Sequence, residues 1–239
     1  MVSRPILGLL ALAVCALAQP AFEVASVKPA DPNANGTSIY GSPGQIHMEN
    51  FSLRELIEQA FHKKDFSVYA PAWLTSACFD IVAKMPAGSS RKEVAAMLQA
   101  LLADRFHLAY HRETRVMSAY ALLVDRKGLK LQPVEGEAQA SGDSGPARLT
   151  ANHTTMSLFA DSLSSQLDRP VKDMTGLPGI YDIKLRWTPE GADPATVNPS
   201  LPTSIFTALQ EIAGLKLERR RMPIEILVVD RIERQPTEN

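Results

Sequence analysis

The feature that most constrains this chain is that its second half repeats the pattern of its first half. Residues 79–84 (FDIVAK) match residues 181–186 (YDIKLR), and residues 122–126 (LLVDR) match residues 227–231 (LVVDR). In each half an apolar helix is expected before the first of these segments, and a second helix between the two segments. A repeat at this spacing marks a repeated supersecondary unit, so we expect two tandem, internally duplicated units.

Helices and strands are predicted from the spacing of apolar residues. The first expected helix has one apolar face with i, i+3, i+4, i+7 spacing, formed by Leu53, Leu56, Ile57, Ala60 and Phe61. Short alternating segments between the helices predict strands, with turns at residues 112–115 and 219–223. Each half is therefore expected to run β-α-β(β)-α-β-β. Helices that alternate with antiparallel strand pairs favour an α+β fold, with the helices packed on antiparallel sheets.

The boundary between the halves is predicted from composition. Residues 135–146 (EGEAQASGDSGP) are rich in Gly and Ser and poor in apolar side chains, which is typical of a linker. The N-terminal half then covers residues 19–134, and the C-terminal half covers residues 147–239.

The first 18 residues have the pattern of a secretory signal peptide. Arg4 precedes an apolar run, and Ala16-Leu17-Ala18 has the small-x-small pattern of a cleavage site. The run is shorter than the roughly 20 apolar residues of a membrane-spanning helix. Lipidation of Cys15 is the alternative, but the bulky Val14 stands before it. We expect cleavage after Ala18 and a mature chain without a membrane span, either periplasmic or extracellular.

Charge and cysteine content exclude some functions of the mature chain. Lys and Arg number 25 and Asp and Glu number 26, so the protein lacks the basic surplus of a nucleic-acid-binding protein. After signal cleavage Cys78 is the remaining cysteine, which excludes an intramolecular disulfide. Beside Phe79 at the start of a predicted strand, it is expected to be a small buried hydrophobic residue.

The order of several motifs resembles one protein family. Residues 22–29, 79–84, 97–108 and 173–182 together resemble an uncharacterised family of exported, soil-associated proteins that is expanded in Acidobacteria. Related domains are attached to membrane zinc-peptidase sensors of the antibiotic-response type. The resemblance implies a sensing or binding role outside the cytoplasm. It implies no peptidase activity, because this sequence lacks the zinc-binding H-E-x-x-H motif.

Four polar residues and one aromatic residue are candidates for a functional groove. His107 and His111 are expected on one face of a strand, where they could begin a metal site, but spacing supplies no further ligands. Solvated side chains are the simpler interpretation, and no metal or other cofactor is expected. Asp80 and Asp182 hold matching positions and could approach as paired acids, or each could accept hydrogen bonds from the preceding turn. Trp73 could mark a recognition surface or pack in the core.

Other short motifs predict no chemistry. Asp173 and Thr175-Gly176 resemble the D-T-G of aspartic proteases, but Met174 interrupts the motif, which is better explained as a turn. The basic run at residues 219–221 could bind an anionic partner or lipid headgroups, but a solvated hairpin tip is the simpler interpretation. The sequence contains neither a G-x-S-x-G nucleophile elbow nor a phosphate-binding glycine loop.

The resulting hypothesis is a non-catalytic exported protein that recognises a protein, a peptide or another ligand of the cell envelope, by strand addition to a sheet edge. The competing hypothesis is an unrecognised hydrolase that uses Asp80, Asp182 and His107 where the halves meet. A passive structural role is a third possibility.

Overall fold

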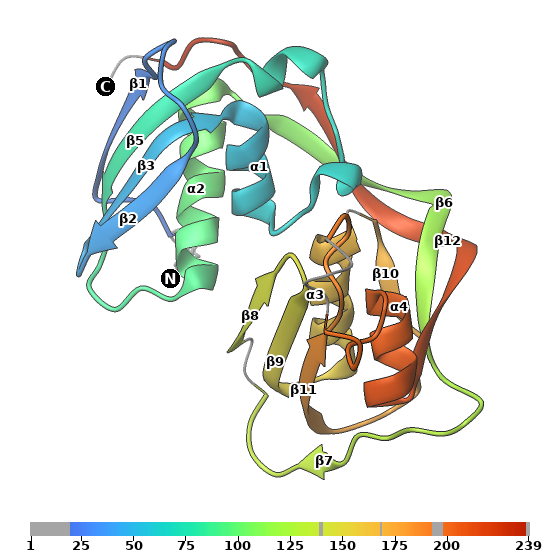
Figure 1. The fold of residues 1–239 in the computed structure, drawn as a ribbon. Coiled ribbons are helices and arrows are strands. Elements are labelled where there is room, and N and C mark those ends of the chain that lie inside the picture. Colours follow the sequence, from blue (N-terminus) through green and yellow to red (C-terminus); the bar gives the residue numbers. More distant parts are fainter. Residues whose placement is uncertain (1–19, 139–140, 168, 193–197, 238–239) are drawn as a thin grey trace, which may run out of the picture. The chain divides into compact units, whose positions relative to one another are not determined.

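The fold contains both helices and antiparallel sheets, which confirms the predicted α+β class (Figure 1). The computed structural model describes residues 20–138, 141–167, 169–192 and 198–237. The predicted signal peptide and Cys15 lie outside these residues. None of the helices in the described part of the chain is long and apolar enough to cross a membrane.

The chain forms two compact units that do not coincide with the two sequence halves. Unit 1 comprises the described residues up to Phe61, together with Thr75–His107 and the described residues from Glu233 onward. Unit 2 comprises His62–Leu74 and the described residues of Leu108–Ile232.

Unit 1 is an antiparallel sheet with the strand order β1-β5-β3-β2 and two helices on one of its faces (Figure 1). Its elements are β1 (Val24–Pro29), β2 (Ser38–Ser42), β3 (Gln45–Ser52), α1 (Leu53–Phe61), β5 (Cys78–Lys84) and α2 (Arg91–Phe106). The predicted apolar face of α1 is buried, and α2 buries Met97, Leu98, Leu101 and Leu102.

Capping boxes begin both helices of unit 1. The Ser52 hydroxyl accepts the backbone N–H of Glu55 at 3.2 Å, and the Glu55 carboxylate accepts the backbone N–H of Ser52 at 2.8 Å. Ser90 and Glu93 form the same reciprocal pair at the start of α2. Each pair satisfies backbone donors that the first helical turn leaves without partners, which fixes where the helix begins.

Unit 2 contains a second sheet with the strand order β7-β11-β9-β8. Its elements are β7 (Pro133–Val134), β8 (Ser141–Gly145), β9 (Arg148–Thr154), α3 (Met156–Leu167), β11 (Ile180–Arg186), α4 (Ile205–Ala208) and the π-helical turn η3 (Leu209–Ala213). Phe159, Leu163, Ile183 and Leu209 are fully buried in its core. Residues 141–145 of the predicted linker therefore form an ordered strand, β8, that pairs with β9.

A third sheet, also in unit 2, is built on two very long strands. β6 (Ala109–Val124) and β12 (Leu215–Arg231) pair antiparallel along almost their whole lengths. β10 (Val171–Asp173) pairs parallel with β6, and β4 (Val68–Tyr69) pairs parallel with β12, which gives the order β10-β6-β12-β4. The short helices η1 (Asp65–Ser67) and η2 (Ala72–Thr75) flank β4.

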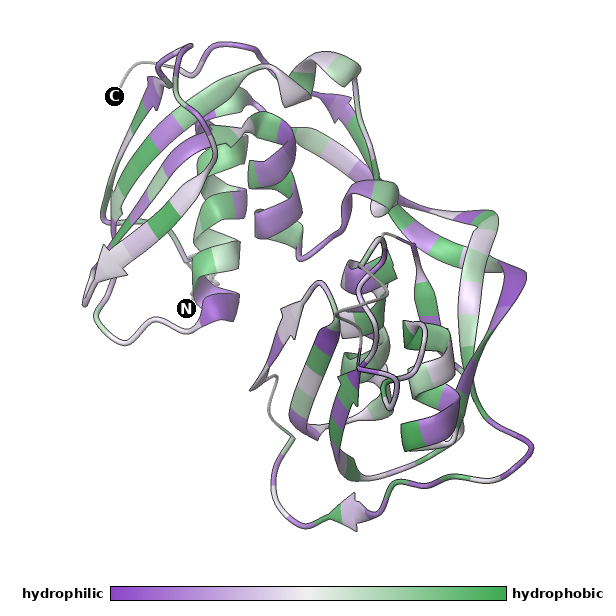
Figure 2. Ribbon diagram, viewed as in Figure 1, coloured by the Kyte–Doolittle hydropathy of each residue, from purple (hydrophilic) through white to green (hydrophobic). Residues whose placement is uncertain are grey.

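The turns predicted at residues 112–115 and 219–223 were wrong, because both segments continue as strand. Glu113 pairs with Ile226 and Arg220 pairs with Ala119 in the uninterrupted ladder. Figure 2 shows the hydrophilic middle of β12 between more hydrophobic segments. Polar runs usually mark turns, but here ion pairs two residues apart along a strand, such as Glu113 with Arg115, satisfy the charges within the sheet.

The first and second sheets share their topology. In both β1-β5-β3-β2 and β7-β11-β9-β8, the strand that comes first in the chain lies beside the fourth, which is followed by the third and then the second. A helix follows the third strand of each, α1 after β3 and α3 after β9. This similarity agrees with the repeated sequence pattern, while duplication as the origin of the pattern stays a prediction.

Candidate functional site

Asp80 and Asp182 each hold a bulge in a neighbouring strand. The Asp80 carboxylate accepts the backbone N–H of Asn50 at 2.8 Å, and the Asp182 carboxylate accepts that of His153 at 2.7 Å. Asn50 and His153 have φ angles of 57° and 47°, a left-handed conformation that non-glycine residues rarely adopt. The aspartates thus stabilise strained backbone on β3 and β9, whereas the sequence predicted hydrogen bonds from the preceding turns.

His107 and His111 do not lie in one strand, so the prediction that they share a strand face was wrong. His107 ends α2 in the left-handed conformation, with its backbone N–H bonded to Leu102 O and its ring nitrogen Nδ1 3.1 Å from Glu233. His111 lies on β6, where Nδ1 is 2.8 Å from Asp230. The helix runs to Phe106, because its apolar face extends that far, and leaves His107 as its cap. The described residues contain no group of three or more His, Cys, Asp or Glu side chains that could hold a metal ion.

Trp73 and Cys78 are both half-buried in the structure. Trp73 lies in η2, next to the fully buried Leu74. Cys78 begins β5, and its burial, with a further contribution from the Glu55 carboxylate, raises the pKa of its thiol. A raised pKa makes the reactive thiolate scarcer at neutral pH, which agrees with the packing role expected for this cysteine.

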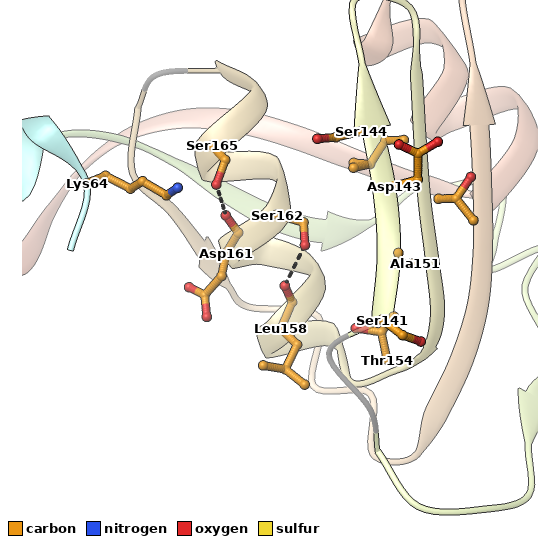
Figure 3. Close-up of a pocket in the computed structure, with 13 residues that line it drawn as sticks. Lys64, Ser141, Asp143, Ser144, Ala151, Thr154, Leu158, Asp161, Ser162 and Ser165 are labelled. Atoms are coloured by element: carbon orange, nitrogen blue, oxygen red, sulfur yellow. Dashed lines mark hydrogen bonds between the residues drawn. The ribbon is translucent and has the colours of Figure 1, made fainter. Parts of the chain in front are cut away.

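A groove of about 320 Å³, with both polar and apolar lining, lies between β8 and α3 in unit 2 (Figure 3). Serine is the most frequent residue in its lining, and charged side chains lie on both the β8 wall and the α3 wall. The polar lining residues are Ser141, Asp143 and Ser144 of β8, Thr150 and Thr154 of β9, Asp161, Ser162 and Ser165 of α3, and Lys64. Leu149, Ala151 and Leu158 supply the apolar part of its wall. We call it the β8–α3 groove.

The groove exists because β8 has no large side chain to cover it. A Cβ atom on Gly142 would collide with the backbone carbonyl oxygen of Thr150 on β9, so only glycine permits this close approach of the two strands. On the opposite wall, Ser162 and Ser165 donate hydrogen bonds to the carbonyls of Leu158 and Asp161 at 3.1 and 3.2 Å (Figure 3). These bonds fold the hydroxyls back onto the helix and leave the groove open.

One side of the groove is an open sheet edge. In the described part of the chain β8 is the last strand of its sheet and pairs with β9 alone. Alternate backbone N–H and C=O groups along its outer edge therefore have no strand partner. Such an edge is a template for an additional strand.

Charges are distributed unevenly along the groove. Asp143 forms an ion pair with Arg148 at 2.7 Å. Asp161 lies across from it on α3, where burial raises the pKa of its carboxyl group while Lys63 and Lys64 act in the opposite direction. Figure 3 shows Lys64 pointing toward α3. Asp161 and Lys64 also line a second groove, of about 470 Å³, together with Lys172, Pro170 and Ile224. The two grooves therefore adjoin each other at Asp161 and Lys64.

Sequence reasoning missed the β8–α3 groove because it assigned β8 to a linker. The signal that could have found it is the pair of segments SGDSG and RLTANHT, separated by Pro146 and Ala147 alone. Two segments joined by two residues are typical of a β-hairpin, and the second segment alternates between apolar and polar side chains.

The fold and this groove define an α+β protein with an open strand edge beside a helix. Residues 54–232 match the family described as protein of unknown function, DUF3738, and the chain belongs to this family. No curated protein and no solved structure matches the chain. The family assignment confirms that the protein is a member of an uncharacterised family. The links to soil bacteria and to membrane zinc peptidases stay predictions.

Proposed function

We propose that this protein is a non-catalytic binding protein that takes up an extended peptide in the β8–α3 groove. The observation that carries the proposal is that the open edge of β8 borders the groove directly. A peptide that adds to this edge would form main-chain hydrogen bonds with β8. Its alternate side chains would enter the space between β8 and α3, the geometry of strand-addition recognition.

The size of the groove suits short side chains, and its wall combines apolar surface with hydroxyl oxygens. About 320 Å³ lies at the lower end of ligand-binding pockets, which span about 300–1,000 Å³. Ser141, Ser162 and Ser165 already donate to backbone carbonyls, so their hydroxyl oxygens are left to accept hydrogen bonds from a ligand. The main-chain bonds would supply affinity, and these acceptors would favour side chains that donate hydrogen bonds.

The proposed location of this binding is outside the cytoplasm. Support comes from the N-terminal sequence, with Arg4, the apolar run and the Ala16-Leu17-Ala18 site. The natural ligand would then be an extended segment of a periplasmic or extracellular protein.

A binding role also agrees with the contacts of the three residues considered for a hydrolase, Asp80, Asp182 and His107. Asp80 and Asp182 each accept a backbone N–H from a bulge, and His107 caps a helix beside Glu233. These contacts account for all three residues without catalysis.

The proposal is tested with peptides selected from a phage-displayed library of random sequences on the immobilised mature protein. Selected peptides are synthesised and their Kd values measured by fluorescence anisotropy. Ser162→Phe and, separately, Ser165→Phe place an aromatic ring in the groove and should weaken binding about tenfold or more, which corresponds to about 1.4 kcal/mol. Ser157→Phe is the matched control, because Ser157 is an exposed residue of α3 outside the groove lining.

Circular dichroism confirms that each variant is folded. If no peptide is enriched, or if the selected peptides bind the groove variants and the control equally well, the β8–α3 groove is not a peptide site.

A further inference from the structure

The basic run Arg219-Arg220-Arg221 lies in the middle of β12, where the strand geometry divides it between two faces. Successive side chains of a strand point to opposite faces, and residues paired across strands share a face. Arg219 pairs with Tyr120 and Arg221 pairs with Ser118. Arg220 pairs with Ala119 on the other face. The three consecutive arginines therefore lie on two opposite faces of the sheet, with Arg219 and Arg221 on one face and Arg220 on the other.

The Arg220 face carries a carboxylate of its own, Glu218, which pairs with both cations of that face. Glu218 accepts hydrogen bonds from Lys216 at 2.5 Å and from Arg220 at 2.6 Å. These two cations lower the pKa of Glu218 to about 2, so the carboxylate is charged throughout the physiological range. Arg220 is thus occupied by an internal ion pair.

The other face carries three arginines whose partners are all neutral. Arg219 donates from Nε to the Ser118 hydroxyl at 3.0 Å, and Arg221 donates to the Val116 carbonyl at 3.4 Å. The guanidinium carbon of Arg169 lies 5.7 Å from the centre of the Tyr120 ring. In the described part of the chain no carboxylate pairs with any of the three. We call Arg169, Arg219 and Arg221, with Tyr120 and Ser118, the arginine face.

We propose that the arginine face binds an acidic peptide segment in extended conformation, with carboxylates on alternate residues. This site is independent of the β8–α3 groove. The spacing is complementary, because residues two apart are about 6.6 Å apart in β12 and in an extended peptide alike. The planar guanidinium group also matches a carboxylate in shape and charge. The Ser118 hydroxyl orients Arg219 through Nε and leaves its terminal amino groups for the ligand.

The shape of this region favours a single extended chain over a lipid surface. β10 pairs with β6 only at residues 120–122, and β4 pairs with β12 only at residues 227–228. The ladder between these contacts is a two-stranded ribbon, and such ribbons twist strongly and present a narrow strip. Val116 is 59% exposed beside the arginines, and Phe206, 38% exposed, contacts the Tyr120 ring edge-on. Both offer apolar contact along the strip.

The test uses a synthetic ten-residue peptide of alternating glutamate and serine with an uncharged dye, and the full mature protein. The double variant Arg219→Gln/Arg221→Gln should weaken its binding, followed by fluorescence anisotropy, about tenfold or more. Arg220→Gln is the control: it removes one positive charge from the same run on the opposite face, compared with two in the double variant. Its affinity should stay within about twofold of the unmodified protein. The corresponding glutamine–serine peptide should not bind.

Three outcomes would overturn the proposal. The first is that the glutamate peptide does not bind the unmodified protein. The second is an equal loss of affinity per removed charge in Arg220→Gln, which would indicate attraction by net charge alone. The third is binding to phosphatidylglycerol vesicles without binding to the peptide, which would assign the arginine face to an anionic lipid surface. Thermal unfolding of each variant confirms that the fold is retained.

Discussion

The hairpin β2–β3 of unit 1 and the hairpin β8–β9 of unit 2 have the same backbone design but different edges. Both connect their strands through two residues, and both place a glycine, Gly41 or Gly142, where a Cβ would collide with a carbonyl of the next strand. Both second strands contain a bulge whose N–H is held by an aspartate of the adjoining strand. The repeated sequence pattern therefore corresponds to a specific local geometry.

The difference between the hairpins lies in the side chains of the edge strands. On β2, Tyr40 stacks on His47 with ring centres 4.9 Å apart and donates a hydrogen bond to Glu49. On β8, the corresponding short strand carries only Gly, Ser and Asp, and the β8–α3 groove opens beside it. The shared backbone thus provides an edge strand in each unit, with the large side chains of Ile39 and Tyr40 on β2 and only small side chains on β8.

The largest expected loss of stability comes from truncating a buried side chain of the helix that follows each hairpin. Leu56 and Phe159 are the fourth residues of α1 and α3, and both are fully buried. Phe159→Ala should lower the free energy of unfolding by about 3–5 kcal/mol and Leu56→Ala by about 2–5 kcal/mol, through lost burial and the cavity left behind. Denaturant unfolding measures both values.

Hydrogen exchange then shows whether the two units respond separately. Phe159→Ala should increase exchange in β9 and β11, while β3 and β5 keep their protection. An equal increase in both sheets would show that the two units open together and do not unfold independently.

An intermediate effect is expected from the two bulge aspartates. Asp80→Ala leaves the Asn50 N–H without its acceptor in a half-buried position, which should cost about 1–3 kcal/mol. Asp182→Ala should cost less, because the Asp182 side chain is 44% exposed and water can replace it. Denaturant midpoints compare the two, and Asp80→Asn, which retains an acceptor oxygen, is the control. A greater loss in Asp182→Ala would contradict this order.

The smallest effect on stability is expected from removing the charge of either of two carboxylates in ion pairs, Glu218 on β12 and Glu113 on β6. Glu218 bonds to Lys216 and Arg220, and Glu113 bonds to Arg115 with His111 nearby. The pKa of Glu218 falls from 4.5 to about 2, and the pKa of Glu113 is also lowered, chiefly by Arg115.

A lowered pKa in the folded state stabilises the protein above the unfolded value, and this contribution is lost as pH falls from 4.5 through about 2. Glu218→Gln should therefore flatten the acid side of the stability profile in that window, measured as Tm against pH. Glu113→Gln should have a weaker effect, since its carboxylate has one arginine partner. Identical profiles for both variants and the unmodified protein would show that neither group contributes.

Sequence patterns predicted those elements whose signals are local. The apolar face of α1 and the strands at residues 79–84 and 181–186 were found, because helix periodicity and strand alternation are visible within about ten residues. The recurrence of Asp80 and Asp182 was also evident, and a structural role was favoured for them. Their actual donors were not predictable, because the bulges lie on strands about 30 residues earlier in the chain.

The candidate sites were less predictable than the elements. The β8–α3 groove depends on the close approach of Gly142 to β9, and the arginine face depends on the register that pairs Arg219 with Tyr120. Composition suggested a linker in one case and a turn in the other. Both segments are polar strands, which local composition does not distinguish from loops.

The α+β class, the family and the apolar helical faces could be read from the sequence, because caps and periodicity act over a few residues. The pairing of β6 with β12 along their length and the open edge of β8 beside α3 depend on the tertiary structure. Strand pairing joins residues about 100 positions apart in the chain and is selected by the packing of the whole sheet. For that reason the surfaces proposed to bind ligands became visible only in the folded protein.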